Sequence, residues 1–163
     1  MKTMPSANPA DVESIDAIIN ASYDVISGPA GKARDWDRER SLFLPCARLV
    51  PTSKAPGVAV RDPNDPLPVF DVEGFIKRVE PFFKETGFYE KEIARRTEQF
   101  GDIVHVWSTY ESRHDPSEAE PFMRGINSIQ LFHDGERWWI LTIFWQQENP
   151  DCPLPTKYLR TEP

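Results

Sequence analysis

The placement of proline constrains this fold more than any other feature of the sequence. Proline has no backbone N–H to donate to a neighbouring strand, so central strands avoid it. The chain has 16 prolines among 163 residues, yet residues 82–115 and 122–149 contain none. We therefore expect a sheet mainly within 88–149. Prolines crowd at 45–68 and in the tail 150–163, where we expect loops or edge structure.

Composition indicates a single folded domain over 1–163. Aromatic residues make up 12% of the chain, more than a disordered acidic chain would carry. The net charge of −7 argues against nucleic acid as a partner, because clustered lysines and arginines bind phosphate backbones. No apolar run of about 18 residues is present to span a membrane. With no N-terminal apolar signal, Cys46 and Cys152 suggest reduced thiols and a cytoplasmic location.

Three helices are expected in the first half of the chain, at about 9–27, 35–44 and 71–86. The first begins with Asn8 as a cap and proline at the first helical position. Asp35 and Asp71 start the other two. Pro81 lies inside the third helix, where it predicts a kink or a break at Glu80. The second helix ends near Leu44 because a residue before proline is disfavoured in a helix.

Four strands are expected at 88–100, 103–114, 122–133 and 137–148. The first has strong helix formers, but Tyr89, Ile93 and Thr97 share one strand face. The last two are joined by Asp134-Gly135, a strong hairpin signal. A two-residue turn would pair 133 with 136, and 127 with 142.

This register gives the last two strands two substantially apolar faces. The face that carries Trp139, Ile143 and Trp145 then needs a cover, since an antiparallel sheet normally leaves one face in water. No further helix is available, so we expect a homodimer formed through the convex face of the sheet.

Four segments carry a resemblance to a known superfamily. They are RDWD at 34–37, STYESR at 108–113, RGINSIQ at 124–130, and RWWI at 137–140 after the Asp134-Gly135 turn. With the helices and the C-terminal meander, they resemble the nuclear-transport-factor-2-like, or SnoaL-like, superfamily, and an uncharacterised bacterial branch of it. The resemblance covers nearly the whole chain.

The resemblance implies an α+β cone. Three N-terminal helices close over a strongly curved antiparallel (mixed) sheet, and a pocket opens at the wide end. The superfamily includes ketosteroid isomerases, polyketide cyclases, dehydratases and binding modules, so the fold alone settles no chemistry.

The resemblance also suggests that the concave face carries Trp138, Ile140 and Phe144, next to Val104, Val106, Ser108 and Tyr110. Hydroxyl and amide groups on this face could orient a ligand, and Asn127 is notable because asparagine is depleted in strands. Tyr110 could equally be a core aromatic, and Asn127 could hold a buried water. The candidate ligand-binding residues are Tyr23, Trp36, Ser108, Tyr110, Asn127, Trp138 and Thr142.

The opposite orientation of the sheet would place other residues in the pocket. His105, Glu111 and Arg124 would then form a candidate catalytic set with acid and base groups. If that face is outside, we expect a Glu111–Arg124 ion pair and His105 packed beside Trp107. No metal-ligand spacing and no glycine-rich phosphate loop is present, so we expect neither a metal nor another cofactor.

Three functions remain open from the sequence. The first is binding of a small hydrophobic molecule in an aromatic-lined pocket. The second is an isomerase, cyclase or dehydratase acting on a polycyclic or aromatic substrate. The third is a protein-interaction module that uses the convex face. The tail and the proline cluster could also form a lid over the pocket, which would favour catalysis.

Overall fold

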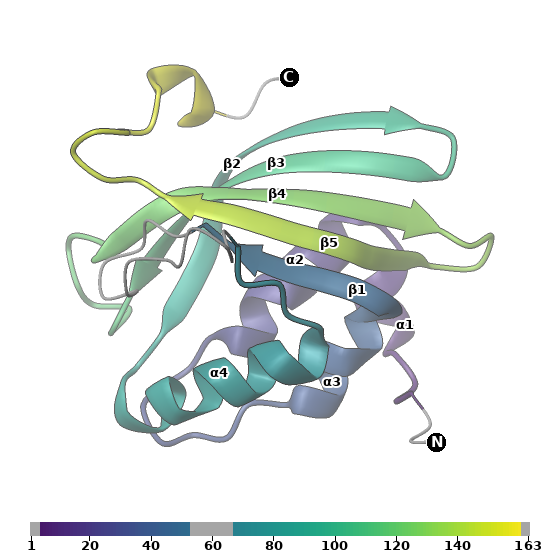
Figure 1. The fold of residues 1–163 in the computed structure, drawn as a ribbon, viewed down its shortest axis with the longest axis horizontal. Coiled ribbons are helices and arrows are strands. Elements are labelled where there is room, and N and C mark those ends of the chain that lie inside the picture. The colour runs from purple at the N-terminus through teal and green to yellow at the C-terminus, as the bar shows by residue number, and fades with distance from the viewer. Residues whose placement is uncertain (1–3, 53–66, 161–163) are drawn as a thin grey trace.

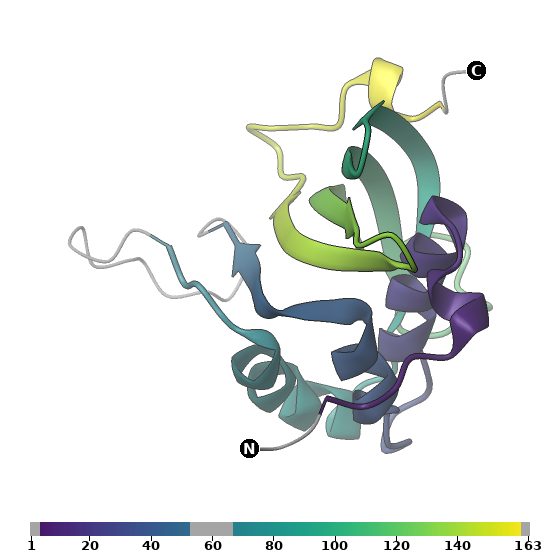
Figure 2. The ribbon, with the colours of Figure 1, turned by 90° about the vertical axis from the view of Figure 1, so that its right-hand side faces the viewer.

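The computed structural model describes residues 4–52 and 67–160. A five-stranded mixed sheet carries the helices on one side (Figure 1). In the view turned by 90°, the sheet curves around the space that the helices occupy (Figure 2). This arrangement confirms the predicted α+β fold class. Residues 53–66, the middle of the predicted proline cluster, lie outside the described part of the chain.

The first predicted helix, at 9–27, is two helices. α1 spans Pro9–Val12 and α2 spans Ile15–Ile26. Asn8 caps α1 as predicted, and the side chain of Ser14 caps α2. A serine side chain that accepts from a free backbone N–H starts a new helix efficiently, which explains why the chain turns between the two. None of the helices in the described ranges is long and apolar enough to cross a membrane.

The second helix leads directly into an edge strand. α3 spans Trp36–Leu42, and the Asp35 side chain caps it by accepting from a backbone N–H at 2.9 Å. The helix ends two residues earlier than predicted, and β1 spans Phe43–Pro51. Among the strands of the sheet, β1 pairs with β5 alone and so forms an edge, where a strand with prolines can lie, and on its other side Leu49 makes an isolated bridge with Phe70.

The third helix runs through its proline. α4 spans Val72–Glu85 without a break at Glu80, so that alternative of the prediction is wrong. Pro81 leaves the carbonyl of Lys77 without its helical partner. Both residues are exposed, so water can bond this carbonyl and the helix continues.

The sheet has the order β1-β5-β4-β3-β2. β2 spans Tyr89–Phe100, β3 spans Ile103–Arg113, β4 spans Met123–His133 and β5 spans Trp138–Gln147. These four strands form the predicted antiparallel meander, including β2, whose composition favours a helix. β1 joins β5 in parallel and makes the sheet mixed.

The turn between β4 and β5 differs from the prediction. His133 pairs with Trp138, so the loop has four residues and the predicted pairing of 133 with 136 is wrong. The Asp134 carboxylate accepts from the backbone N–H groups of Glu136 and Arg137, each at 2.9 Å. Aspartate stabilises such a turn by bonding the backbone that follows it, which accounts for the longer loop.

Bulges in two strands change which side chains point into the cone. In β5 the register shifts between Ile140 and Thr142, which leaves Leu141 as an extra residue. Ile143 therefore pairs with inward-facing Ile129, and the predicted interior position of Thr142 is wrong.

The same bulge reverses two more assignments in β5. Phe144, predicted inside, pairs with Ser128 on the outer face and is 40% exposed. Trp145, predicted on the outer face, pairs with Asn127 and faces the interior. In β2, Ile93 is the extra residue, and Glu90 and Glu92 pair with Ser112 and Tyr110.

The core lies between the helices and the concave face. Val104, Val106, Ser108 and Tyr110 are at most 3% exposed, which confirms the predicted orientation of β3. Ile18 and Ile19 of α2 are fully buried and pack in the same cluster. The convex face therefore carries the odd-numbered residues of β3, as expected.

The C-terminal segment covers part of the convex face. Its short helix η1, Thr156–Tyr158, lies above the sheet, away from the helices (Figures 1 and 2). The Tyr158 ring packs against Trp107 with 5.8 Å between ring centroids, and its carbonyl accepts from the Thr109 hydroxyl at 2.6 Å. The described tail therefore supplies part of the cover for which we expected a second copy of the chain.

Candidate functional site

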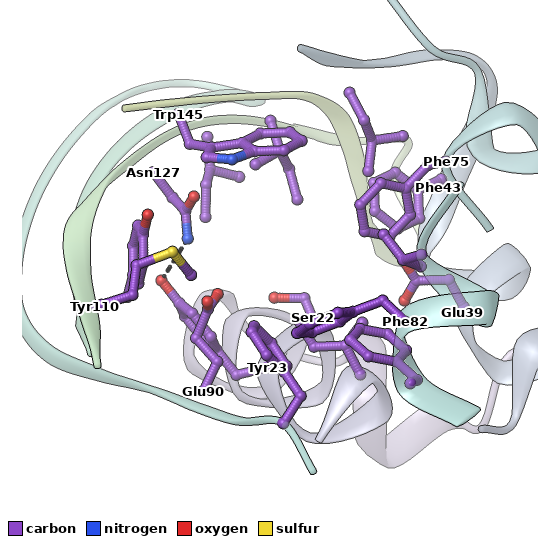
Figure 3. Close-up of a pocket in the computed structure, with 18 residues that line it drawn as sticks. Ser22, Tyr23, Glu39, Phe43, Phe75, Phe82, Glu90, Tyr110, Asn127 and Trp145 are labelled. Atoms are coloured by element: carbon purple, nitrogen blue, oxygen red, sulfur yellow. Dashed lines mark hydrogen bonds between the residues drawn. The ribbon is translucent and has the colours of Figure 1, made fainter. Parts of the chain in front are cut away.

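A cavity of about 180 Å³ lies between the helices and the concave face of the sheet. Helices α2, α3 and α4 form one wall of the cavity, and residues of all five strands contribute to the rest of its lining (Figure 3). The lining residues are Ser22, Tyr23, Ile26, Glu39, Phe43, Leu49, Phe75, Val79, Phe82, Phe83, Phe88, Glu90, Tyr110, Met123, Asn127, Ile129, Ile143 and Trp145.

Aromatic rings form much of the apolar wall. Phe82, Phe83 and Phe88 contact one another with 5.2 to 6.2 Å between ring centroids. Phe75 of α4 meets Trp145 of β5 edge to face at 6.2 Å. Such rings bury large apolar areas and keep a fixed shape, so this wall suits an apolar ligand.

A hydrogen-bonded chain crosses one end of the cavity. The Asn127 amide donates to the Tyr23 hydroxyl at 2.9 Å, and the Tyr23 and Ser108 hydroxyls are 2.7 Å apart. Ser108 in turn donates to the Glu92 carboxylate. Because the single hydroxyl hydrogen of Ser108 goes to Glu92, Tyr23 must donate to Ser108. The Tyr23 proton is thus directed away from the cavity, and burial raises the Tyr23 pKa.

Glu90 of β2 lies at the same end of the cavity, beside Tyr23 and Tyr110 (Figure 3). Its carboxylate accepts from the Ser112 hydroxyl at 2.7 Å. Burial raises the Glu90 pKa to about 7, while the Ser112 hydroxyl and the Asn127 amide oppose part of the rise. A carboxyl group that titrates near neutral pH can either accept or donate a proton.

Tyr110 has a free hydroxyl at this end. The residue is 1% exposed, and its hydroxyl is a buried atom without a hydrogen-bond partner among the described residues. Burial raises its pKa, so the hydroxyl stays protonated. Gly125 makes room for it, because a Cβ at this position would lie 2.6 Å from the Tyr110 hydroxyl.

Glu39 of α3 lies at the other end of the cavity, among Phe43, Phe75 and Phe82 (Figure 3). The residue is 2% exposed, and its Oε2 has no hydrogen-bond partner in the described part of the chain. Burial raises its pKa to about 8, although the nearby charge of Arg38 lowers it in part. The two acidic side chains thus lie at opposite ends of an apolar space.

The predicted ligand-binding residues divide into two groups. Tyr23, Tyr110 and Asn127 line the cavity, and Ser108 lies behind Tyr23 as its hydrogen-bond partner. The other three do not line it. Trp36 stacks on Phe83 with 6.2 Å between ring centroids, Trp138 packs on His133, and Thr142 faces outward after the bulge.

The alternative set of His105, Glu111 and Arg124 lies on the convex face and does not come together. His105 contacts the Ser128 hydroxyl at 3.0 Å, and its ring packs beside Trp107, as expected for an outer position.

The predicted Glu111–Arg124 ion pair does not form, although the two residues are neighbours across β3 and β4. Glu111 binds Arg113 and Lys91 instead, and Arg124 binds Glu148 at 2.6 Å. Glu111 finds partners on its own strand and on β2, and Arg124 finds one just after β5, so these residues form no catalytic set.

Glu39 and Glu90 are the residues that sequence reasoning missed. Glu39 follows Asp37 and Arg38 in a charged helix, a pattern typical of a solvated face. Glu90 lies in a strand whose apolar residues alternate with it, so simple alternation predicts that Glu90 faces outward. The bulge at Ile93 turns it toward the cavity instead. No group of three or more His, Cys, Asp or Glu suitable for a metal ion occurs in the described residues.

Comparisons with known proteins place the fold. No protein-family model matches the chain, and no curated protein matches it. A structure of an NTF2-like protein of unknown function from Silicibacter pomeroyi is 15% identical, with 83% of this chain and 94% of that chain covered and a TM-score of 0.52. A protein from Kribbella flavida is 9% identical, with 84% and 92% covered and a TM-score of 0.59.

A putative ketosteroid isomerase from Parabacteroides distasonis is 10% identical, with 91% and 98% covered and a TM-score of 0.55. The chain therefore has the NTF2-like fold, where NTF2 is nuclear transport factor 2. Identities this low show that the fold is shared, and they carry no information about activity.

Proposed function

We propose that the protein binds a small, mostly apolar molecule in the cavity between the helices and the sheet. The observation that carries this proposal is a cavity of about 180 Å³ with aromatic walls, whose two carboxyl side chains lie at its opposite ends and whose Ser22 hydroxyl, between them, is bonded to the Ile19 carbonyl. An apolar cavity of comparable size is known to hold a benzene-sized molecule. The polar ends would then fix the orientation of the ligand.

The test is to fill the cavity by mutation. Ile129 is 1% exposed and lines the cavity, whereas the next residue, Gln130, is exposed on the other face of the same strand. Titration calorimetry with 2-phenylethanol should show binding to the natural protein and to Gln130→Phe, and none to Ile129→Phe. Native mass spectrometry of the purified protein would show any molecule that it retains. Equal binding by both variants would contradict the proposal.

A second candidate function is proton transfer at carbon, as in an isomerase or dehydratase. The observation that favours it is Glu90, a cavity carboxyl whose pKa is raised by burial to about 7. In this reaction a substrate C–H bond breaks, its proton passes to the Glu90 carboxylate, and the electrons form an enolate. The free Tyr110 hydroxyl at the same end could donate to the enolate oxygen.

Hydrogen exchange tests this second function without knowledge of the substrate. Incubation with 2-tetralone in D₂O should give deuterium at the carbon next to the carbonyl, detected by mass spectrometry. Glu90→Gln should abolish the catalysed exchange, and Glu136→Gln, at an exposed glutamate, should not. Exchange no faster than in buffer alone would count against catalysis of this type and leave the binding function standing.

A further inference from the structure

Glu39 is an unusual residue to bury in an apolar wall. It is 2% exposed, and its Oε2 has no partner among the described residues. A buried carboxyl oxygen without a hydrogen bond costs free energy in the folded state. Its place on the cavity wall suggests that the missing partner belongs to a bound molecule (Figure 3).

The described lining of the cavity contains acidic side chains but no positively charged one. None of its described lining residues is Lys, Arg or His. The two nearby arginines have other partners. Arg38 binds Asp11 and Asp24, and Arg34 donates to carbonyl oxygens of the chain, including those of Ile26 and Gly28. A positive charge for Glu39 would therefore come from the ligand.

The surroundings of Glu39 also suit a cation. Phe43, Phe75 and Phe82 lie around the carboxyl end of its side chain in Figure 3. The faces of aromatic rings attract ammonium groups, and this attraction grows when the site is desolvated. A carboxylate next to aromatic rings thus offers both parts of an amine-binding site.

We propose that the cavity selects an apolar molecule that carries a protonated amine, and that the carboxylate of Glu39 and the adjacent phenylalanine rings bind the ammonium group. The inference rests on the proposed binding function and names the chemical class of its ligand. The apolar body of the ligand would extend toward Glu90 and Asn127 at the other end of the cavity.

Proton release provides a signature of this pairing. Glu39 is largely protonated in the empty protein at pH 7, because its pKa is raised to about 8. An ammonium ion favours the carboxylate, so binding would displace the proton into the buffer. The other ionisable groups on the cavity wall are Tyr23 of α2, Glu90 of β2 and Tyr110 of β3, and Arg38 acts from the same helix.

Three probes of similar shape and different charge test the proposal by titration calorimetry. They are 2-phenylethylamine, 2-phenylethanol and 3-phenylpropionate, which are a cation, a neutral molecule and an anion at pH 7. We expect the amine to bind at least about tenfold more tightly than the alcohol, and the anion more weakly than either. The measured heat of amine binding should differ between phosphate and Tris buffers, and that of alcohol binding should not, because the amine displaces a proton and the neutral alcohol does not.

Two matched variants locate the effect. Glu39→Gln keeps the shape of the side chain and should remove both the amine preference and the proton release, while the alcohol still binds. Glu90→Gln should leave the preference for the amine over the alcohol in place. The melting temperature and circular dichroism of each variant show that it is folded.

The possible failures are distinguishable. If the alcohol binds as tightly as the amine, or if Glu39→Gln keeps the preference, the amine inference is wrong while the binding function stands. If the preference is lost in Glu90→Gln instead, the ammonium site has been placed at the wrong end. If no probe binds the natural protein at millimolar concentration, the proposed function fails and the inference fails with it.

Discussion

The two inner strands of the antiparallel meander, β3 and β4, and their outer neighbours, β2 and β5, reach the cavity in different ways. β3 and β4 pair in one uninterrupted register, from Ser112 opposite Met123 to Ile103 opposite Phe132. β2 and β5 each contain one extra residue, Ile93 and Leu141, at which the register shifts. A bulge re-aims the side chains beyond it, so strict alternation fails there.

The difference shows in what each strand contributes. The regular strands place Tyr110, Asn127 and Ile129 on the wall as simple alternation requires. The bulged strands add Glu90 and Trp145, which alternation from their turns would have placed outside. The ionisable carboxyl of the sheet wall thus comes from an irregular strand, while the regular strands supply the frame.

The largest effect that we predict comes from a change that disrupts the regular pair of strands, β3 and β4. A Cβ at Gly125 would lie 2.3 Å from the Gln146 carbonyl oxygen and 2.6 Å from the Tyr110 hydroxyl. One of these contacts is with backbone, which cannot give way cheaply. We expect Gly125→Val to prevent folding at 25 °C, seen as loss of the near-ultraviolet circular dichroism signal.

Gly74→Ala is the control for this change. Its Cβ would lie 3.1 Å from the Asp71 side chain, which can move, so the free energy of unfolding should change by less than about 1 kcal/mol. A folded Gly125→Val protein with natural stability would show that β4 does not depend on this close approach.

The next effect tests the bulge in β5 directly. Because Ile143 faces the cavity and Thr142 faces outward, Ile143→Lys would bury a charge while Thr142→Lys would not. We expect Ile143→Lys to lower the free energy of unfolding by about 3 kcal/mol or more, and Thr142→Lys to change it by about 0.5 kcal/mol or less. Urea unfolding measures both. The register without a bulge predicts the reverse order.

These strands also show how far the sequence determines the fold and the site. Proline-free windows locate the sheet, and capping residues such as Asn8, Asp35 and Asp71 locate helix starts, because both signals act through the backbone. The orientation of β3 and β4 follows from the resemblance together with the apolar residues of β3. Tyr110 and Asn127 could therefore be assigned to the interior, whereas Tyr23 lies on α2 and its place does not follow from the strands.

The remaining site residues depend on tertiary structure. A bulge leaves no clear signal in a strand with apolar residues on both faces, so alternation assigns Trp145 to the wrong face. Glu39 is buried because α3 packs against α2, β1 and β5, whereas its own segment has the pattern of a solvated charged helix. Partners that are distant in sequence decide such positions.

The pH dependence of stability distinguishes the two carboxyl groups that lie at opposite ends of the cavity, Glu39 and Glu90. Burial raises the pKa of Glu39 to about 8 and of Glu90 to about 7, from an ordinary value of 4.5. Above the ordinary value the unfolded chain has released protons that the folded chain still holds. The free energy of unfolding therefore falls as pH rises from about 4.5, and levels off above the folded pKa values.

Chemical unfolding between about pH 5 and about pH 9 measures this slope. Glu39→Gln should remove the part that extends to about pH 8, and Glu90→Gln the part that ends near pH 7. Glu13→Gln, at an exposed position, serves as the control. A slope of the opposite sign in this window, or one that both cavity variants leave intact, would contradict the assigned burial of these carboxyls.

The convex face offers the last comparison, between the half under the tail and the half without it. Tyr158 covers β2 and β3, whereas Phe132 and Phe144, on β4 and β5, are 37% and 40% exposed. The bulge turns Trp145 inward and leaves a smaller apolar surface than the sequence suggests. We still propose that this half forms a homodimer contact, because two exposed rings on neighbouring strands favour burial.

Light scattering should then give twice the chain mass of 18.7 kDa at micromolar concentration. Phe144→Glu should reduce the mass to that of one chain, and because the side chain is already exposed, it should change the free energy of unfolding of the protomer by only about 0.5 kcal/mol. Glu136→Gln, in the β4–β5 loop, should leave the mass unchanged. A natural protein that scatters as a single chain would show that the tail and the inward turn of Trp145 already satisfy this face.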